Sequence, residues 1–137
     1  MRTLCAIVVS SFIVLAAAVT PAAGADYYFV ADGYWDDATK WKDDCNNGNE
    51  GQVPSASDNA VICSSVTCTI RNDDAVCLGL TVDGTLILGN SDTLEIHANS
   101  SIPGTMTVEN YGTLNIDASL TLSGGEVSFG ILHRVSG

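Results

Sequence analysis

Between Asn59 and Phe129 the chain alternates short apolar pairs with residues that favour turns. Within each short run the apolar side chains recur at every second position, and Gly, Asn, Asp or Ser separates one run from the next. Successive side chains of a strand point to opposite faces, so each pair lines one buried face. The pattern predicts strands over residues 60–63, 66–70, 78–82, 85–88, 93–96, 105–108, 113–116, 120–122 and 127–129. No amphipathic helix of useful length is predicted, so the fold class is all-β.

The predicted strands also resemble one another. The stretch from Leu80 to Leu86 recurs from Met106 to Leu114 with a short insertion, so that Val82 aligns with Val108 before the insertion and Leu86 with Leu114 after it. A degenerate repeat with very short strands is typical of a parallel β-solenoid, in which coils of about 20–30 residues stack on one another. A β-sandwich is the alternative, because Asp83-Gly84 is a turn signal of tight hairpins.

Residues 1–25 have the pattern of a secretory signal peptide. Arg2 precedes an apolar stretch, and Ala23-Gly24-Ala25 has the form of a cleavage motif that leaves Asp26 first. An uncleaved membrane anchor is the alternative, but the stretch of about 16 apolar residues is shorter than the ~20 that span a bilayer. We therefore expect a secreted chain, extracellular or at the cell surface, with no membrane segment after cleavage.

Removal of this segment makes the net charge of the chain more negative. Residues 26–137 carry 4 basic and 16 acidic side chains, a net charge of −12, which argues against a nucleic-acid partner. Half of the acids and both Trp residues fall in residues 26–58. This division predicts an acidic, Trp-containing cap or loop segment over 26–58 and solenoid coils over 59–137. The end of the chain is apolar and lacks a polar cap, which predicts either a fragment of a longer protein or self-association through this edge.

Four cysteines remain after the signal segment. An even number in a small secreted domain predicts two disulfides, with no pairing favoured by the spacing. The spacing does not match a zinc site, and no His lies nearby. Asn99-Ser100-Ser101 is a glycosylation sequon, which makes Asn99 a modification candidate. The cysteines are Cys45, Cys63, Cys68 and Cys77.

Two aromatic residues of the cap segment are the leading ligand-binding candidates. Trp35 and Trp41, with Tyr34, Asp36 and Asp37 beside them, have the residue types of a sugar-stacking platform. The alternative, which a solenoid end favours, is that the two indoles cover the apolar floor of the first coil.

Metal binding and catalysis have weaker signals. Asp43, Asp44 and Glu50 are weak calcium candidates, because carboxylates are suitable ligands but their spacing departs from the EF-hand loop. A solvated acidic surface is the alternative, and calcium is the one cofactor considered. Arg71 and Arg134 are the basic residues of the strand region, and no pair of carboxylates stands out as an acid and a base. We therefore predict no catalytic residues.

Several short motifs follow one another along the chain in an order that resembles that of a known family. Gly33-Tyr34-Trp35 and Trp41 are followed by Val53-Pro54, by Asp58-Asn59-Ala60-Val61-Ile62, and then by the runs at 66–70 and 80–86. This order resembles secreted bacterial β-helix surface proteins of the planctomycete and autotransporter-like types, and it is similar to the extracellular G8 domain. The likeness covers about residues 29–125. It implies a right-handed parallel β-helix with an N-terminal capping segment, and it implies no catalytic residues.

Together these features predict a secreted, non-catalytic β-solenoid with a structural, adhesive or carbohydrate-binding role at the cell exterior. The expected partner is an extracellular polysaccharide or another surface component. One alternative is the N-terminal fragment of a polysaccharide-active β-helix enzyme. The other is a calcium-stabilised extracellular module.

Overall fold

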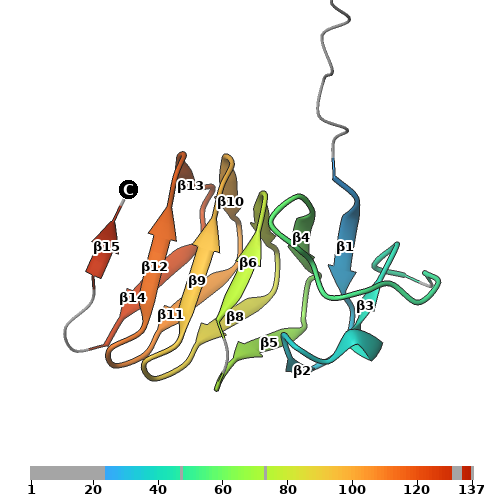
Figure 1. The fold of residues 1–137 in the computed structure, drawn as a ribbon, viewed down its shortest axis with the longest axis horizontal. Coiled ribbons are helices and arrows are strands. Elements are labelled where there is room, and N and C mark those ends of the chain that lie inside the picture. Colours follow the sequence, from blue (N-terminus) through green and yellow to red (C-terminus); the bar gives the residue numbers. More distant parts are fainter. Residues whose placement is uncertain (1–23, 47, 73, 131–133, 137) are drawn as a thin grey trace, which may run out of the picture.

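Short strands with one apolar face cannot bury that face alone, and here they do so by winding into stacked coils. The computed structural model describes residues 24–46, 48–72, 74–130 and 134–136, and the strands form three sheets around one interior (Figure 1). The predicted all-β solenoid is confirmed. The sandwich alternative is excluded, because every pairing between coils is parallel.

Each complete coil contributes one strand to each of the three sheets. Sheet 1 has the order β3 (Trp41–Lys42), β1 (Asp26–Phe29), β4 (Asn59–Ile62), β7 (Leu80–Val82), β10 (Ser100–Ile102) and β13 (Leu120–Leu122). Sheet 2 has the order β2 (Gly33–Tyr34), β5 (Thr67–Ile70), β8 (Thr85–Leu88), β11 (Thr105–Val108) and β14 (Glu126–Phe129). Sheet 3 has the order β6 (Ala75–Cys77), β9 (Thr93–Ile96), β12 (Thr113–Ile116) and β15 (Arg134–Ser136).

The register between neighbouring coils is regular in the middle of the stack. Thr81 lies beside Ser101, and Thr85 lies beside Thr105, so equivalent positions recur once per coil at a constant separation in the sequence. The predicted alignment of Val82 with Val108 is therefore wrong, because Val82 belongs to sheet 1 and Val108 to sheet 2. Strand β10, which the sequence pattern did not predict, is the element that restores the correct register.

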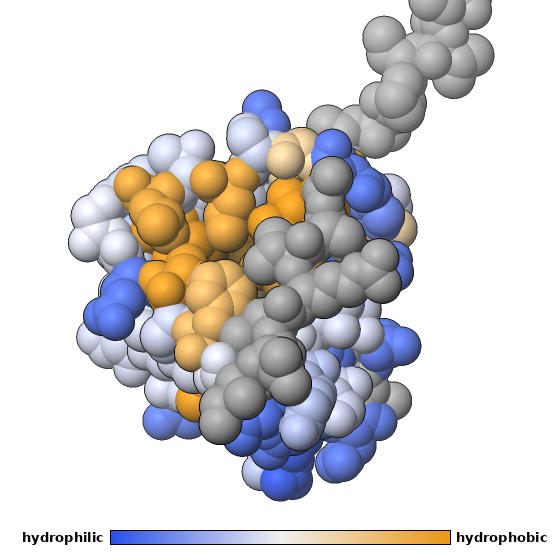
Figure 2. Space-filling view, turned by 90° about the vertical axis from the view of Figure 1, so that its left-hand side faces the viewer, coloured by the Kyte–Doolittle hydropathy of each residue, from blue (hydrophilic) through white to orange (hydrophobic). Residues whose placement is uncertain are grey.

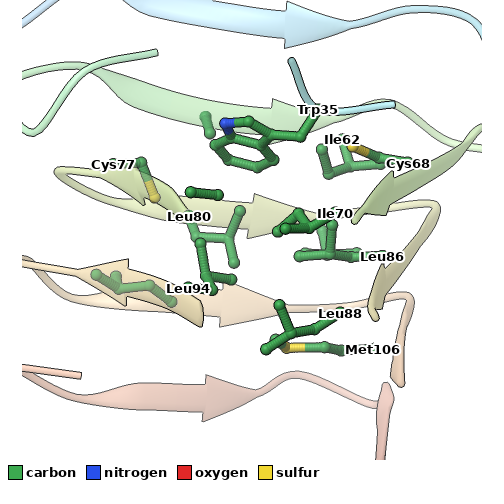
Figure 3. Close-up of a cluster of buried hydrophobic side chains, with 14 of the residues drawn as sticks. Trp35, Ile62, Cys68, Ile70, Cys77, Leu80, Leu86, Leu88, Leu94 and Met106 are labelled. Atoms are coloured by element: carbon green, nitrogen blue, oxygen red, sulfur yellow. The ribbon is translucent and has the colours of Figure 1, made fainter. Parts of the chain in front are cut away.

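The interior is a continuous column of aliphatic side chains. Residues at equivalent positions of successive coils stack on one another, and the column runs from the cap into the third complete coil (Figure 3). Ser100 is a polar residue at an inward-facing position of this column: it is buried, accepts a hydrogen bond from the Leu80 N–H (2.8 Å) and donates one to the Ala98 carbonyl (3.1 Å). Because both ends of this hydroxyl are satisfied, the stack tolerates a serine at that position.

The corner between sheets 2 and 3 uses an unusual backbone conformation in three successive coils. Asn72, Ser91 and Tyr111 occupy this corner in successive coils and have φ values of 59°, 66° and 62°. This left-handed region favours Gly or Asn, and Asn72 fits it well. Tyr111 adopts it without such a preference, and its ring lies on the surface.

The cap segment adds an incomplete coil to the N-terminal end of the stack. Strand β1 pairs in parallel with β4, and β2 pairs with β5, but among the described residues no strand of the cap joins sheet 3. The chain instead turns through the 3-10 helix η1 (Ala38–Lys40) and returns as β3, antiparallel to β1. The cap is thus more ordered than the loop-rich segment that its composition predicts.

The cysteines form one disulfide rather than the two that we predicted. Cys45 is bonded to Cys63 and ties the Asn-rich loop of the cap to the end of β4. Cys68 on β5 and Cys77 on β6 are free, and their side chains enter the interior from different sheets (Figure 3). Apolar neighbours separate them, so a second disulfide would require the packed interior to rearrange.

The predicted signal peptide falls largely outside the described residues, which begin at Gly24. Within the described part of the chain, no helix has the length and apolar character needed to cross a membrane.

Candidate functional site

The two Trp residues of the cap lie inside it rather than on its surface. Trp41 is 0% exposed and Trp35 is 4% exposed. The Trp41 ring packs edge-on against Trp35 and Phe29, with ring centroids 4.8 and 5.0 Å apart, and its indole N–H donates to the Trp35 carbonyl at 2.7 Å. These contacts fit the capping alternative, in which the rings cover the end of the interior column, and Figure 3 shows Trp35 at that end. Neither indole offers an open face on which a sugar ring can stack.

A pocket lies where the cap meets the first complete coil. It has a volume of about 170 Å³, and it opens at the place where the cap contributes no strand to sheet 3. The residues that line it are Trp35, Asp36, Val53, Pro54, Ile70, Arg71, Asp74, Ala75 and Val76. We call it the cap pocket. It is smaller than the ~300–1,000 Å³ of drug-sized sites, so it suits a single small group such as one sugar ring.

The cap pocket joins an apolar wall to charged side chains. The small exposed part of Trp35, together with Val53, Pro54 and Ala75, supplies the apolar wall. Exposed carboxylates of Asp36 and Asp74 and the guanidinium of Arg71 supply hydrogen-bonding groups. Such a combination suits a sugar, whose ring has apolar C–H faces and whose hydroxyl groups both donate and accept hydrogen bonds.

Tyr34 holds Arg71 in position beside the pocket. The Arg71 guanidinium lies 3.5 Å from the centroid of the Tyr34 ring, which is a cation–π contact. Tyr34 points outward from β2, which pairs with β5 through Thr69, and Arg71 directly follows β5. The contact therefore links the cap to the first complete coil and limits the freedom of the guanidinium.

Asp37, which the sequence grouped with the ligand candidates, has a local structural role. Its carboxylate accepts hydrogen bonds from the Thr39 N–H (3.0 Å) and the Thr39 hydroxyl (2.6 Å) at the start of η1. The Thr39 hydroxyl, followed by the Thr39 N–H, lowers the pKa of Asp37. Asp37 is an N-cap of this short helix rather than part of the cap pocket.

The three calcium candidates are held by donors of their own segment. Asp43 accepts from the Asn49 N–H (2.6 Å) and side-chain amide (2.9 Å), and these bonds lower its pKa, the side-chain amide contributing most. Asp44 accepts from the Asn46 N–H at 2.8 Å, and Glu50 lies 3.9 Å from the Lys42 ammonium. Among the described residues no group of three or more His, Cys, Asp and Glu side chains is placed to hold a metal ion.

Two pairs of side chains bridge successive coils at the corner between sheets 3 and 1. His97 Nδ1 lies 2.6 Å from Asp117 Oδ2, a partner that the sequence pattern did not indicate. Asn99, the glycosylation candidate, is exposed, and its side-chain oxygen accepts from the Ser119 hydroxyl at 2.9 Å. In both pairs the partners are 20 residues apart, which is the length of one coil.

Sequence reasoning identified part of the cap pocket and missed the rest. It identified Trp35 and Asp36, but not Arg71, Asp74 or Val76 as their neighbours. The register between the cap and the first complete coil hides this proximity, because Gly33 lies beside Cys68, much farther along the chain than the length of one coil. The Tyr34–Arg71 pair had no signal in the sequence for the same reason.

Comparison with known proteins adds no family to this description: no family model, no curated protein and no solved structure matches the chain.

Proposed function

We propose that this protein is a secreted, non-catalytic β-solenoid that binds carbohydrate at the cell exterior through the cap pocket. The observation that carries the proposal is the lining of that pocket, which places an apolar wall containing Trp35 beside two carboxylates and a guanidinium. Signal-like residues 1–25 and the Cys45–Cys63 disulfide support an extracellular location. The proposed role is adhesion, with a polysaccharide as the partner.

The proposed ligand contact differs from the surface platform of two Trp rings that the sequence offered as an alternative to capping. The buried indole of Trp35 contributes only one edge of the apolar wall of the cap pocket. Selectivity among ligands would come from the charged side chains around it. Arg71 is the best residue to change, because it is exposed, it lines the pocket, and its main contact is with the Tyr34 ring. Trp35 is a poor choice, because its removal would disturb the aromatic packing of the cap.

Binding to a glycan array and co-sedimentation with insoluble polysaccharides test the proposal. Arg71→Ala should weaken binding at least about tenfold, which corresponds to about 1.4 kcal/mol. Val76→Trp should have a similar effect by filling the pocket from a half-exposed position. Lys42→Ala is the matched control, because it removes one positive charge from the cap outside the pocket. The proposal fails if no glycan is retained, or if Arg71→Ala and Lys42→Ala bind as the unaltered chain does.

A further inference from the structure

Asp58 is a buried carboxylate at the base of the cap. It is 8% exposed, it directly precedes β4, and it lies away from the apolar residues that gather at the opposite end of the stack, the end that faces the viewer in Figure 2. Its Oδ2 accepts hydrogen bonds from the Ser55 N–H (3.0 Å) and hydroxyl (2.5 Å), and its Oδ1 accepts one from the Ala25 N–H (3.2 Å). Within the described ranges no Lys, Arg or His side chain forms an ion pair with it. A buried negative charge is costly unless it is paired, so this site favours a cation.

The backbone of Ala25 is bound both to this carboxylate and to the residue that follows it. The Ala25 N–H donates to Asp58, and the Ala25 carbonyl accepts from the Asn59 N–H at 2.8 Å, one residue before β1 begins. Asp26 continues this pairing, because its carboxylate accepts from the Asn59 side-chain amide at 2.7 Å. Gly24, the first described residue, has no such bond with the rest of the described chain. Ala25 is therefore the residue at which the described chain joins the fold.

The residues before this point allow two places for signal cleavage. Signal cleavage sites have small residues at the first and third positions before the cut. Ala23-Gly24-Ala25 meets this condition for a cut before Asp26, and Ala22-Ala23-Gly24 meets it for a cut before Ala25. The two products differ only in Ala25, so the contacts of that residue distinguish them.

We propose that the signal segment is cut between Gly24 and Ala25, and that the α-ammonium freed there forms an ion pair with the carboxylate of Asp58. Hydrolysis by the signal peptidase of the host cell adds one water across this peptide bond. The Gly24 carbonyl becomes a carboxylate on the released segment, and the Ala25 nitrogen becomes an ammonium. This nitrogen already lies 3.2 Å from Asp58 Oδ1, so the new charge meets its partner where it forms. A cut one residue later removes a donor from Asp58 and the carbonyl that accepts from the Asn59 N–H.

An ammonium suits this position better than the amide that it replaces. An α-amino group has an ordinary pKa of about 7.7–8.0, so it is mainly protonated at neutral pH. A hydrogen bond between charged groups is roughly twice as strong as one between neutral groups. The surroundings also favour a positive charge, because residues 26–137 carry 16 acidic and 4 basic side chains.

Expression of the full chain in an exporting host cell, followed by N-terminal sequencing and intact mass of the product, tests the cut. We expect Ala25 as the first residue. Two variants form a matched pair, because a large Leu is excluded from the first and third positions but tolerated between them. Gly24→Leu should abolish the product that begins at Ala25, whereas Ala23→Leu should leave it. A cut before Asp26 requires the reverse pattern.

The outcomes separate this inference, which rests on the proposed secretion, from the proposed function itself. A product that begins at Asp26 or at any other residue, or the reverse pattern in the two variants, overturns the inference alone. An uncleaved chain retained in the cell overturns secretion and the inference with it. Glycan binding is measured separately, because neither Ala25 nor Asp58 lines the cap pocket.

Thermal melting of the exported product tests the ion pair. Acetylation of the α-amine at neutral pH, where it reacts before Lys because its pKa is lower, restores a neutral N–H at Ala25. It should lower the melting temperature of the unaltered chain by about 3 °C or more, and have little effect in Asp58→Asn. Asp26→Asn is the matched control, because it removes a neighbouring carboxylate that binds Asn59, and it should show the full shift. No shift in the unaltered chain, or equal shifts in all three chains, would overturn the ion pair.

Discussion

The burial of Trp41 leads to a quantitative prediction about what the cap does. Trp41→Ala removes a side chain that is 0% exposed, two edge-on ring contacts, and the hydrogen bond to the Trp35 carbonyl. Deleting a buried Trp costs about 3–5 kcal/mol through lost transfer energy and the cavity left behind. Loss of the donor to a buried carbonyl adds about 1 kcal/mol. We therefore expect a loss of about 4–6 kcal/mol in the free energy of unfolding.

Urea unfolding followed by far-UV circular dichroism measures this loss. With a slope of about 2 kcal/mol per molar urea, within the usual range for small proteins, the midpoint should fall by about 2–3 M. Trp41→Phe keeps a ring in the aromatic stack but loses the indole N–H, so it should cost about 1–2 kcal/mol. Substituting an exposed ring changes stability by less than about 0.5 kcal/mol, and Tyr111→Ala provides that comparison. A loss below about 1 kcal/mol for Trp41→Ala would refute the capping role and restore the surface platform.

Four other predictions concern the cysteines, the base of the cap, the coil corner and the acidic loop. Cys68 and Cys77 should resist a water-soluble thiol reagent at pH 8 until denaturant is added, because burial raises the pKa of Cys77 to about 12 and shields both thiols; rapid labelling of the folded chain would contradict this. The Ser55 hydroxyl, followed by the N–H groups of Ser55 and Ala25, holds the pKa of Asp58 below its usual value. Its stabilisation is therefore present above about pH 4 and disappears as the pH falls through the lowered pKa, so urea midpoints should fall less on acidification in Asp58→Asn than in the unaltered chain. Gly104→Ala should lower the melting temperature by several degrees, because the new Cβ would lie 2.6 Å from the Asp83 carbonyl oxygen and also against that of Gly84; an unchanged melting curve would show that the corner relaxes. Addition of a calcium chelator should leave the melting temperature unchanged, because donors of the loop already occupy Asp43 and Asp44, and a fall in the melting temperature would favour the calcium-stabilised alternative.

The strands that alternate apolar and polar residues could be predicted from the sequence almost to the residue. β8, β9, β11, β12 and β13 have the predicted bounds. β10 was missed because Ser100 occupies an interior position, and its hydroxyl is satisfied by backbone groups that no local pattern reveals. Because β10 was not predicted, the repeat length inferred from the sequence was wrong, although the predicted solenoid class was correct.

The cap was harder to predict because its contacts are long in sequence and irregular in spacing. Trp35 and Trp41 could be identified as important, but whether their rings face inward depends on β1 and β2 pairing with β4 and β5, which lie far along the chain. The prediction of the disulfides was limited in the same way. An even number in a short chain favours two disulfides, whereas the structure places Cys68 and Cys77 on different walls of one interior.

The regular register of the middle coils has a consequence for how the length of this molecule can vary. The coils β7–β9 and β10–β12 present equivalent edges to their neighbours, so removal of residues 80–99, or their duplication in tandem, preserves every pairing on either side. Each such step changes the distance between the cap and the far end by about 4.8 Å, the spacing of adjacent strands. A change in the number of coils would therefore alter the distance between the cap pocket and the far end of the solenoid in steps of this size.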